Sequence, residues 1–483
     1  MNEIMATASF QLLAFALVAA IVYNLHNSLG WRQSVLLIAN AYFLYTFVGN
    51  VQSILPLMGF VVLGYLGVWT MQRHATTATY VGMLVLVIGS FVWLKKYTFL
   101  PSVTVLHFTY VTVGLSYILF RVLHLMIDAH ANLLPEKIGP LPYLNYTLNF
   151  MTLVSGPIQK YEDFQKTGRA TVPPRLTVIA VGEGLHRIVV GFFKIAVLSL
   201  IFSRLQKHML AALVPGQALP HRALTAASMA VAYTLYLYSN FSGYIDIVIG
   251  VGRFFGFQLP ENFDRPFSAD SFMNFWSRWH ITLSDWLKTY VFNPLLMAGM
   301  RRISSISLQP FIAVPAIFFT FFLVGVWHGQ TSEFLFFGFL LGFGIAANLL
   351  YQILLEKHWG RKRYRTFASN PVYTAFSRGL TFTWITFALL WFWSNWGQLR
   401  EIAVTLGWRG ILLFFAAILL PATVVLGVIE MTRDRALAVR WKGYTVLLSP
   451  YTLTVFDTSL SIASFVVVIL LHHTSPAIVY KAF

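Results

Sequence analysis

Long apolar stretches recur along the whole chain, with short polar turns between them. A helix of about 20 mostly apolar residues crosses the hydrocarbon core of a bilayer. When shorter and broken segments are counted, the pattern predicts about a dozen transmembrane or re-entrant helices. The clearest runs are Phe10 to Tyr23, Ser34 to Val48, Val81 to Leu94, Phe311 to Val326 and Ile411 to Ile429. We therefore expect an all-α polytopic membrane protein.

The composition leads to the same expectation. Of the 483 residues, 57% are hydrophobic and only 11% are charged, and the mean hydropathy is +0.68. A chain this apolar cannot hide its nonpolar surface in one aqueous core, so it needs lipid as its solvent.

The chain is strongly basic, with 34 Lys and Arg against 17 Asp and Glu. The basic residues lie in loops between apolar runs, so they are explained by membrane topology rather than by binding to nucleic acid. Two basic segments, Lys357 to Arg365 and Arg433 to Lys442, are separated by two apolar runs. Both are expected on the cytoplasmic side, as topological anchors or as binding sites for anionic lipid or an acyl donor.

One apolar run is broken in an unusual way. Phe150 to Val154 is followed at once by Ser155-Gly156-Pro157. Proline lacks a backbone donor and kinks a helix, so the freed backbone groups need protein or water as partners rather than lipid. We therefore predict a re-entrant or kinked element that lines a cavity.

Charged residues are concentrated in two later segments. The first is a predicted helix from Val178 to Ile201, in which Glu183 and Arg187 lie four residues apart and are expected to pair. The second, Tyr238 to Tyr290, contains no run apolar enough to cross a membrane, and its prolines divide it into short helices. We predict that it forms a large loop or the partly buried wall of a polar cavity.

Two histidines lie in aromatic surroundings. On a continuous helix, Trp276, His280 and Ser284 would share one face at a spacing of four. A lone histidine among indoles is commonly a structural hydrogen-bond donor, and that alternative stays open for His280. His328 follows the apolar run from Phe318 to Trp327, where an ionisable group facing lipid would cost about 2.5 to 3.5 kcal/mol. His328 is therefore expected to face a wet interior and to be functional.

A histidine in a membrane cavity is suited to general-base catalysis. Its unperturbed pKa of about 6.5 lets it take a proton from a hydroxyl near neutral pH. Other chemistries lack their sequence patterns, because the chain has no HxxxH or HExxH metal pattern, no GxSxG elbow and no cysteine. We expect neither a metal site nor a bound cofactor.

Four segments resemble the membrane-bound O-acyltransferases, in particular their bacterial polysaccharide-modifying branch. The alginate O-acetyltransferase type and the D-alanyl-lipoteichoic acid transferase type belong to that branch. The segments occur in the order expected of the family: SGPIQKYEDF from Ser155, NFSGYIDIVIGVGRFFGFQLPENFDRPF from Asn240, FWSRWHITLSDWLKTYVFNPL from Phe275, and VGVWHGQTSEFLFFG from Val324. The first segment is closer to the D-alanyl type, whereas Leu259 to Phe263 is closer to the alginate type.

The resemblance implies a bundle of helices around a central tunnel, in which a cytoplasmic acyl donor meets an acceptor from the other side. We expect transfer of an acyl group, in the first place acetyl, to a hydroxyl of a cell-surface polysaccharide or of a partner transferase. The donor would be a thioester, either acetyl-CoA or an acyl-carrier protein. D-alanyl transfer from a carrier protein to a cell-envelope polymer is the alternative. The protein would work in the inner (cytoplasmic) membrane, among membrane lipids.

The resemblance also assigns roles to residues. His328 corresponds to the catalytic histidine of the family and is expected to be the general base. His280 corresponds to its second signature histidine and would orient the donor or the oxyanion. Trp276, Arg278 and Trp327 would shape the tunnel walls, and Asp246 and Glu261 would hold the polar lining together. The expected substrate-binding residues are Trp276, Arg278, Trp327, Asp246, Glu261, Asn262 and Ser284.

A single membrane-embedded acyltransferase domain is expected over residues 1–483. It would comprise N-terminal scaffold helices at 1–130, a catalytic core at 140–355 and C-terminal helices at 356–483. The rival from another class is a transporter or polysaccharide exporter, but many transporters show internal repeats and none is visible here. A membrane scaffold with only a docking role would explain the basic loops, but not two histidines in tryptophan-rich surroundings.

Overall fold

The computed structural model describes residues 10–101, 105–134, 136–168, 177–438, 440–441, 444–445 and 450–471. The contacts within the chain divide it into two compact units. Unit 1 contains the described parts of Met1–Ile195 and Phe241–Glu261, and unit 2 contains those of Ala196–Asn240 and Asn262–His472. The borders of these units differ from those of the expected subdivisions at 1–130, 140–355 and 356–483, and the single acyltransferase domain stays a prediction.

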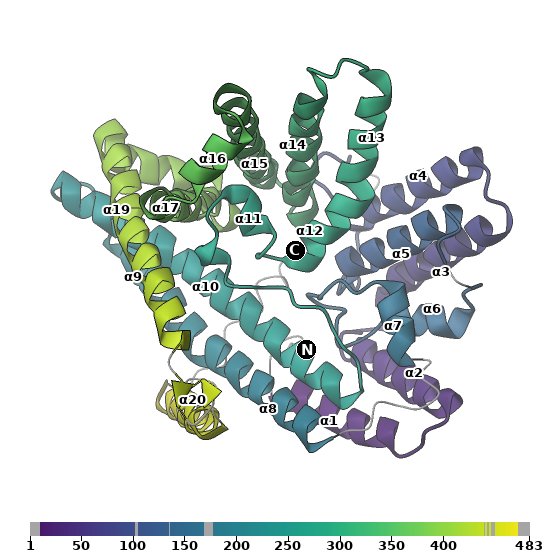
Figure 1. Ribbon diagram of the computed structural model, residues 1–483. Coiled ribbons are helices and arrows are strands. Elements are labelled where there is room, and N and C mark those ends of the chain that lie inside the picture. The colour runs from purple at the N-terminus through teal and green to yellow at the C-terminus, as the bar shows by residue number, and fades with distance from the viewer. Residues whose placement is uncertain are drawn as a thin grey trace. The chain divides into compact units, whose positions relative to one another are not determined.

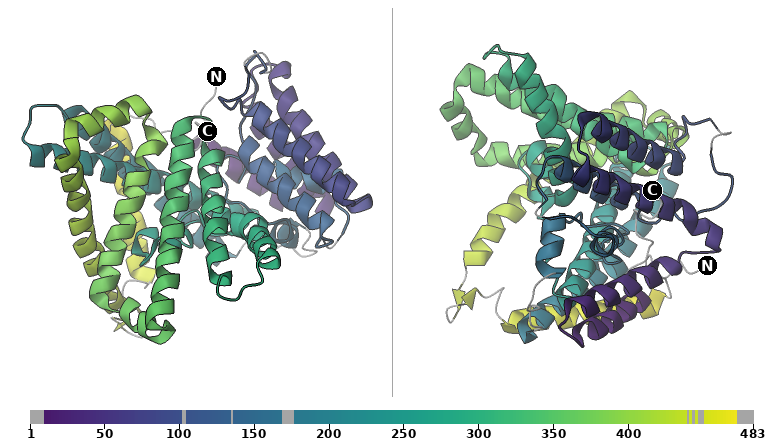
Figure 2. Two further views of the ribbon diagram at one scale, coloured as in Figure 1. Left: turned by 90° about the horizontal axis from the view of Figure 1, so that it is seen from above. Right: turned by 90° about the vertical axis from the view of Figure 1, so that its right-hand side faces the viewer.

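Unit 1 begins with four apolar helices, and local hydrogen bonds set the starts of α2, α3 and α4. Asn50 caps α3 by accepting from Ser53 N, and Thr76 forms a reciprocal capping box with Thr79 at the start of α4. Helices α3, α4 and α5 pack side by side (Figures 1 and 2). The helices of unit 1 are α1 (Phe10–Asn24), α2 (Leu29–Tyr45), α3 (Val51–Arg73), α4 (Thr77–Leu94), α5 (Leu115–His130), α6 (Pro140–Thr147), α7 (Tyr161–Gly168) and α8 (Val178–Phe193).

Between α6 and α7 the chain is irregular and buried, as predicted for the segment around Ser155-Gly156-Pro157. The apolar run is thus interrupted where a re-entrant or kinked element was predicted, and the role of this element in lining a cavity stays a prediction. Helix α8 continues through the π-helical stretch η3 (Lys194–Ser199) into α9 (Leu200–Ala212). The long helix α10 (Leu219–Phe254) has its first part in unit 2 and its last part in unit 1.

Unit 2 contains short elements first and long helices afterwards. The segment Tyr238 to Tyr290, which was predicted to lack a conventional span and to consist of short helices, begins with the end of the long helix α10 and contains short elements only after it. The short elements are η4 (Pro266–Ser268), α11 (Phe272–Trp276), α12 (Ile281–Leu287), η5 (Lys288–Phe292) and α13 (Asn293–Arg302). They are followed by α14 (Gln309–His328), α15 (Ser332–Trp359), α16 (Arg361–Ala368), α17 (Pro371–Ala388), α18 (Leu390–Trp393), α19 (Trp396–Ala438) and α20 (Pro450–Leu471).

The only strands in the described part of the chain are β1 (Arg440–Trp441) and β2 (Tyr444–Thr445), which form a two-stranded antiparallel pair. The expected basic segment Arg433 to Lys442 reaches positions 439 and 442, which lie outside the described residues. The other basic segment, Lys357 to Arg365, covers the end of α15 and most of α16.

Six helical segments in the described residues are long and apolar enough to cross a membrane. They are Val51–Arg73, Thr77–Leu94, Val178–Ala212, Gln309–His328, Ser332–Trp359 and Trp396–Arg433, and two shorter apolar helices cover Gln11–Asn24 and Thr454–Val467. The predicted all-α, polytopic class is confirmed. The expected number of about a dozen transmembrane or re-entrant helices included half-spans and broken runs. The central tunnel stays a prediction.

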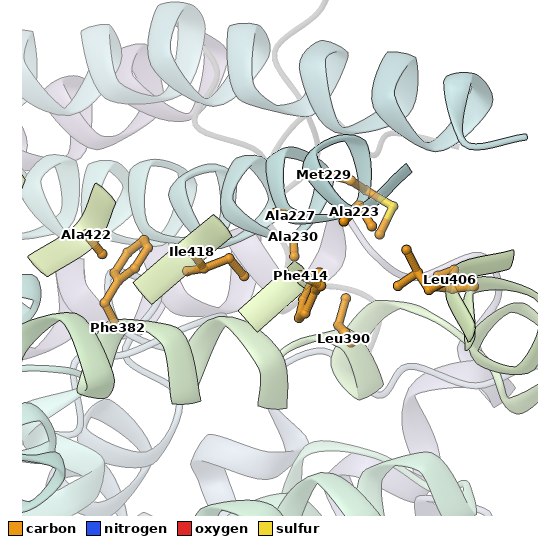
Figure 3. Packing of buried hydrophobic residues seen from close by; sticks show 12 residues of the cluster. Ala223, Ala227, Met229, Ala230, Phe382, Leu390, Leu406, Phe414, Ile418 and Ala422 are labelled. Carbon is orange, nitrogen blue, oxygen red and sulfur yellow. The ribbon is translucent and has the colours of Figure 1, made fainter. Parts of the chain in front are cut away.

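A hydrophobic core in unit 2 is built from residues of α10, α17, α18 and α19. The cluster combines small residues of α10, such as Ala227 and Ala230, with larger side chains such as Phe382 of α17 and Phe414 of α19 (Figure 3). Such a combination of small and large side chains gives the close packing typical of protein interiors. The core holds α17 and α18, and Phe392 of α18 contacts the ring of His328.

Helices α14 and α15 approach each other closely at two glycines. A Cβ atom at Gly325 would lie 2.3 Å from the carbonyl oxygen of Phe334 and 2.4 Å from the Cα atom of Gly338. Only glycine allows this contact, which lies one helical turn before His328. The close approach therefore fixes the end of α14 against α15.

Candidate active site

His280 lies in a turn between two short helices, not within one continuous helix. Helix α11 ends at Trp276, and His280 is the residue before the first turn of α12. Its backbone is left-handed, with φ 46° and ψ 50°, which is uncommon for a residue other than glycine. The expectation that Trp276, His280 and Ser284 share the face of a single helix is therefore wrong, because the chain leaves the helix between the first two.

The turn at His280 is held by pairing with the segment that begins at Asn262. Phe263 and Trp279 form an isolated antiparallel bridge. Ile281 N donates to the carbonyl oxygen of Asn262 at 3.0 Å, and Asp264 N donates to that of Arg278 at 2.9 Å. These backbone bonds offset the cost of the left-handed conformation. They also bring the side chains of Asn262 and His280, which belong to different segments of the sequence, next to each other.

The side chain of Asn262 is buried, and its Oδ1 atom lies within hydrogen-bond distance of three groups. They are Thr282 N at 3.1 Å, Thr282 Oγ1 at 2.9 Å and His280 Nδ1 at 3.2 Å. A backbone N–H can only donate, so the atom facing Thr282 N must be the amide oxygen. It follows that the proton of His280 is on Nδ1. Burial lowers the pKa of His280 to about 3, so the imidazole is neutral at physiological pH.

His328 is the last residue of α14, where the apolar run ends. Its side chain is buried among rings. Its ring centroid lies 4.6 Å from that of Trp327, 5.0 Å from that of Phe392 and 6.1 Å from that of Phe337. The aromatic contacts fix the plane of the imidazole and keep lipid away from it.

Trp327 is a shared neighbour of the two histidines. Its ring centroid lies 6.3 Å from that of His280 and 4.6 Å from that of His328. Both histidines are buried, with exposed fractions of 1% and 4%. The tertiary structure therefore places the two expected catalytic residues around one indole.

Three buried polar atoms of the expected site residues have no hydrogen-bond partner in the part of the chain that the structure describes. They are Trp276 Nε1, Ser284 Oγ and Asn262 Nδ2. Each can donate a hydrogen bond. Buried polar groups in native proteins are nearly always satisfied by protein, water or ligand, so these three donors can bind a water molecule or a substrate group.

Arg278 differs from these residues because its guanidinium forms a hydrogen bond and an ion pair with neighbouring side chains. Its Nε donates to Asn274 Oδ1 at 3.1 Å, and its guanidinium lies 3.6 Å from a carboxylate oxygen of Asp264. Its contacts thus brace the turn that carries His280. Its expected role in shaping a tunnel wall stays a prediction.

Asp246 and Glu261 belong to unit 1, where they accept from Arg187. Asp246 binds Arg187 at 2.9 Å and Lys194 at 2.6 Å, and Arg187 also pairs with Glu261. The expected pair of Glu183 with Arg187 is wrong, since Glu183 pairs with Arg253 instead. Close packing of α8 against α10 brings partners on the facing helix within reach. A role of Asp246 and Glu261 in substrate binding stays a prediction.

The sequence analysis missed Arg121, which is 1% exposed in α5. Its guanidinium donates to the carbonyl oxygens of Tyr146, Thr147 and Thr152, and to Thr152 Oγ1, at 2.6 to 2.9 Å. It thereby satisfies carbonyl oxygens at the end of α6 and one in the irregular segment that precedes Ser155-Gly156-Pro157. An arginine inside an otherwise apolar helix was the available signal, because such residues are costly unless they face protein.

Together, the fold and the site define a polytopic membrane protein with a buried pair of histidines. The sequence model of the membrane-bound O-acyltransferase family matches residues 69–391. The chain therefore belongs to this family. The matched range contains all four segments on which the resemblance was based, and that interpretation is confirmed.

The chain is similar to several bacterial proteins. It is 28% identical to the teichoic acid D-alanyltransferase of Bacillus subtilis (strain 168) over 57% of this chain and 66% of that protein. It is 30% identical to the probable alginate O-acetylase of Pseudomonas aeruginosa over 48% of this chain and 42% of that protein. It is also 30% identical to the peptidoglycan O-acetyltransferase of Helicobacter pylori over 45% of this chain and 39% of that protein. The matches thus span less than two thirds of each relative.

Proposed function

We propose that this protein is an O-acyltransferase of the inner membrane. It transfers an acyl group, in the first place acetyl, from a cytoplasmic thioester to a hydroxyl of a cell-surface polysaccharide or of a partner transferase. The observation that carries the proposal is the pair of buried imidazoles around Trp327, together with the three buried donors of Trp276, Ser284 and Asn262 that have no partner in the described part of the chain. Membership of the family supports it.

In the proposed reaction His328 is the general base. Its imidazole takes the proton of the acceptor hydroxyl while the oxygen attacks the thioester carbonyl. The C–O bond forms, the C–S bond breaks, and the thiolate leaves with a proton returned by the imidazolium. His328 lies at the C-terminal end of α14. The partial negative charge of a helix C-terminus stabilises the positive charge that develops on the ring.

D-alanyl transfer is the second candidate. The match to the teichoic acid D-alanyltransferase of Bacillus subtilis covers more of this chain than the matches to the two O-acetylating relatives described above. A D-alanyl ester and an acetyl ester form by the same attack on a thioester, so the two histidines would serve both reactions. The donors differ, however, and can be offered separately.

The first test uses membranes that contain the wild-type protein and cell-envelope polysaccharide. Radiolabelled acetyl-CoA and a D-alanyl carrier protein are supplied in parallel, and label in the polymer is measured. His328→Ala should reduce transfer by about 10²- to 10⁴-fold, the range for loss of a general base. His221→Ala, which changes an exposed histidine, is the matched control.

The same variants distinguish the rival functions. A transporter or exporter would still move polysaccharide across the membrane when His328 is replaced, and a scaffold would be unaffected. Retention of acyl transfer by correctly inserted His328→Ala protein would remove this residue from the mechanism and with it the proposal.

A further inference from the structure

We propose that a groove beside α16 binds the phosphate group of an anionic phospholipid, such as phosphatidylglycerol, at the membrane surface. The open groove has a volume of about 780 Å³ and lies where the chain turns from α15 to α17. The inference concerns a lipid site and does not depend on the proposed acyl transfer. The residues that line this α16 groove include Trp359, Arg361, Lys362, Arg363, Thr366 and Phe367.

The α16 groove lies at one end of a candidate membrane span. Helix α15 is long and apolar enough to cross a membrane, and its last residue, Trp359, lines the groove. Helix α16 packs against both α15 and α17 (Figure 1). Because the apolar stretch of α15 gives way here to the basic segment, this end of the span is at the depth of the lipid headgroups. The basic segment was expected on the cytoplasmic side, where the membrane surface is negatively charged.

Helix α16 carries positive charge that the described part of the chain does not neutralise. Its exposed cations are Arg361, Lys362, Arg363 and Arg365. None of them forms an ion pair with another described residue. The sequence has no Asp or Glu between Glu356 and Glu401. Since a guanidinium can bind phosphate through two parallel hydrogen bonds, a groove lined by three of these cations is suited to a phosphate group.

The aromatic side chains of the groove favour a lipid over a small soluble anion. Trp359 and Phe367 are 38% and 37% exposed, and their ring centroids lie 5.3 Å apart in an edge-to-face contact. Inorganic phosphate would be held by the cations alone, whereas a phospholipid also brings apolar groups that can lie on the exposed rings. Tryptophan is enriched at membrane interfaces because it can contact both apolar and polar groups. Charge and apolar surface together therefore match a phospholipid.

The test uses the purified full-length protein in neutral detergent. It is titrated with phosphatidylglycerol, and native mass spectrometry measures the bound lipid. The wild-type protein should bind phosphatidylglycerol more tightly than phosphatidylcholine with the same acyl chains. A cation near an anionic headgroup contributes about 5-fold to affinity, so Lys362→Gln combined with Arg363→Gln should weaken this binding by about 25-fold. Glutamine has a helix propensity similar to that of lysine and arginine, so α16 is preserved.

Arg301→Gln combined with Arg302→Gln is the matched control. It also removes two exposed cations, from the last turn of α13 and outside the groove. The control protein should bind phosphatidylglycerol with wild-type affinity. Melting temperatures of the purified proteins show whether each variant folds. If the double variant in α16 does not fold, the single change Lys362→Gln, with an expected loss of about 5-fold, decides instead.

The source of the phosphate is tested by competition. An equal concentration of inorganic phosphate or coenzyme A should not displace phosphatidylglycerol from the wild-type protein. Displacement by either compound would assign the groove to a soluble phosphate and overturn the lipid proposal. Wild-type affinity in the folded α16 variant, or an equal loss of affinity in the control, would also overturn it. No acyl donor takes part in the binding measurement, so failure of the proposed acyl transfer would leave its result unchanged.

Discussion

The contact between α14 and α15 offers a quantitative test of how the fold positions the site. A Cβ atom at Gly325 would lie 2.3 Å from the carbonyl oxygen of Phe334, whereas real Cβ atoms stay at least 3.0 Å from such atoms. Gly325→Ala therefore forces the two helices apart by about 0.7 Å. The obstacle is backbone, which cannot rotate away. Overpacking of this kind typically costs about 1 to 3 kcal/mol of stability.

The displacement reaches the site because His328 lies three residues after Gly325, and Phe337, which contacts its ring, precedes Gly338 on α15. A shift of about 1 Å in a catalytic group can cost about 100-fold in rate. We expect Gly325→Ala to lower kcat by about 10- to 100-fold and to lower the melting temperature. Acyl transfer and thermal unfolding of the purified protein measure the two effects.

Gly89→Ala in α4 is the control for the loss of glycine itself. A Cβ atom at this position would meet nothing within 4 Å. Alanine is favoured over glycine in a helix by about 1 kcal/mol, so stability should hold or rise and activity should not change. If Gly325→Ala matched Gly89→Ala in both measurements, the argument that this helix contact places His328 would be refuted.

Two further changes test the buried polar groups of unit 1. Arg121→Met leaves carbonyl oxygens and Thr152 Oγ1 without their hydrogen-bond donor. Because each buried unsatisfied group costs about 1 to 3 kcal/mol of stability, we expect poor expression and a strongly lowered melting temperature. A melting curve like that of the wild-type protein would contradict this. Asp246→Asn removes the carboxylate shared by Arg187 and Lys194 and should destabilise the protein. Adding Lys194→Met to it should restore part of the loss, because one uncompensated charge disappears; no recovery in thermal unfolding would count against the pairing.

Several features followed directly from the residue pattern. Apolar runs of bilayer length predicted a helical membrane protein, because lipid offers no partners for unpaired backbone groups. The position of His328 at the end of such a run marked it as a candidate. The break at Ser155-Gly156-Pro157 predicted irregular backbone. Each of these features depends on residues that are neighbours in the sequence, or on the lipid solvent that the hydropathy of the chain implies.

Other features were decided only by tertiary structure. The spacing of Trp276, His280 and Ser284 suggested one helix, but pairing with the segment from Asn262 turns the chain out of it. Likewise, Glu183 and Arg187 were four residues apart, yet each found partners on another element. The spacing of residues along a helix predicts which of its side chains can meet. It does not predict which charged group on another element will pair with one of them instead.

The sequence by itself determined the membrane fold class, the family and the two histidines. Tertiary structure decided the neighbours that give these histidines their chemistry: the indole of Trp327 and the amide of Asn262. The physical reason is that a buried polar atom must be satisfied by whatever group the packing brings to it. That group can come from any part of the chain, so its identity is not contained in a local pattern.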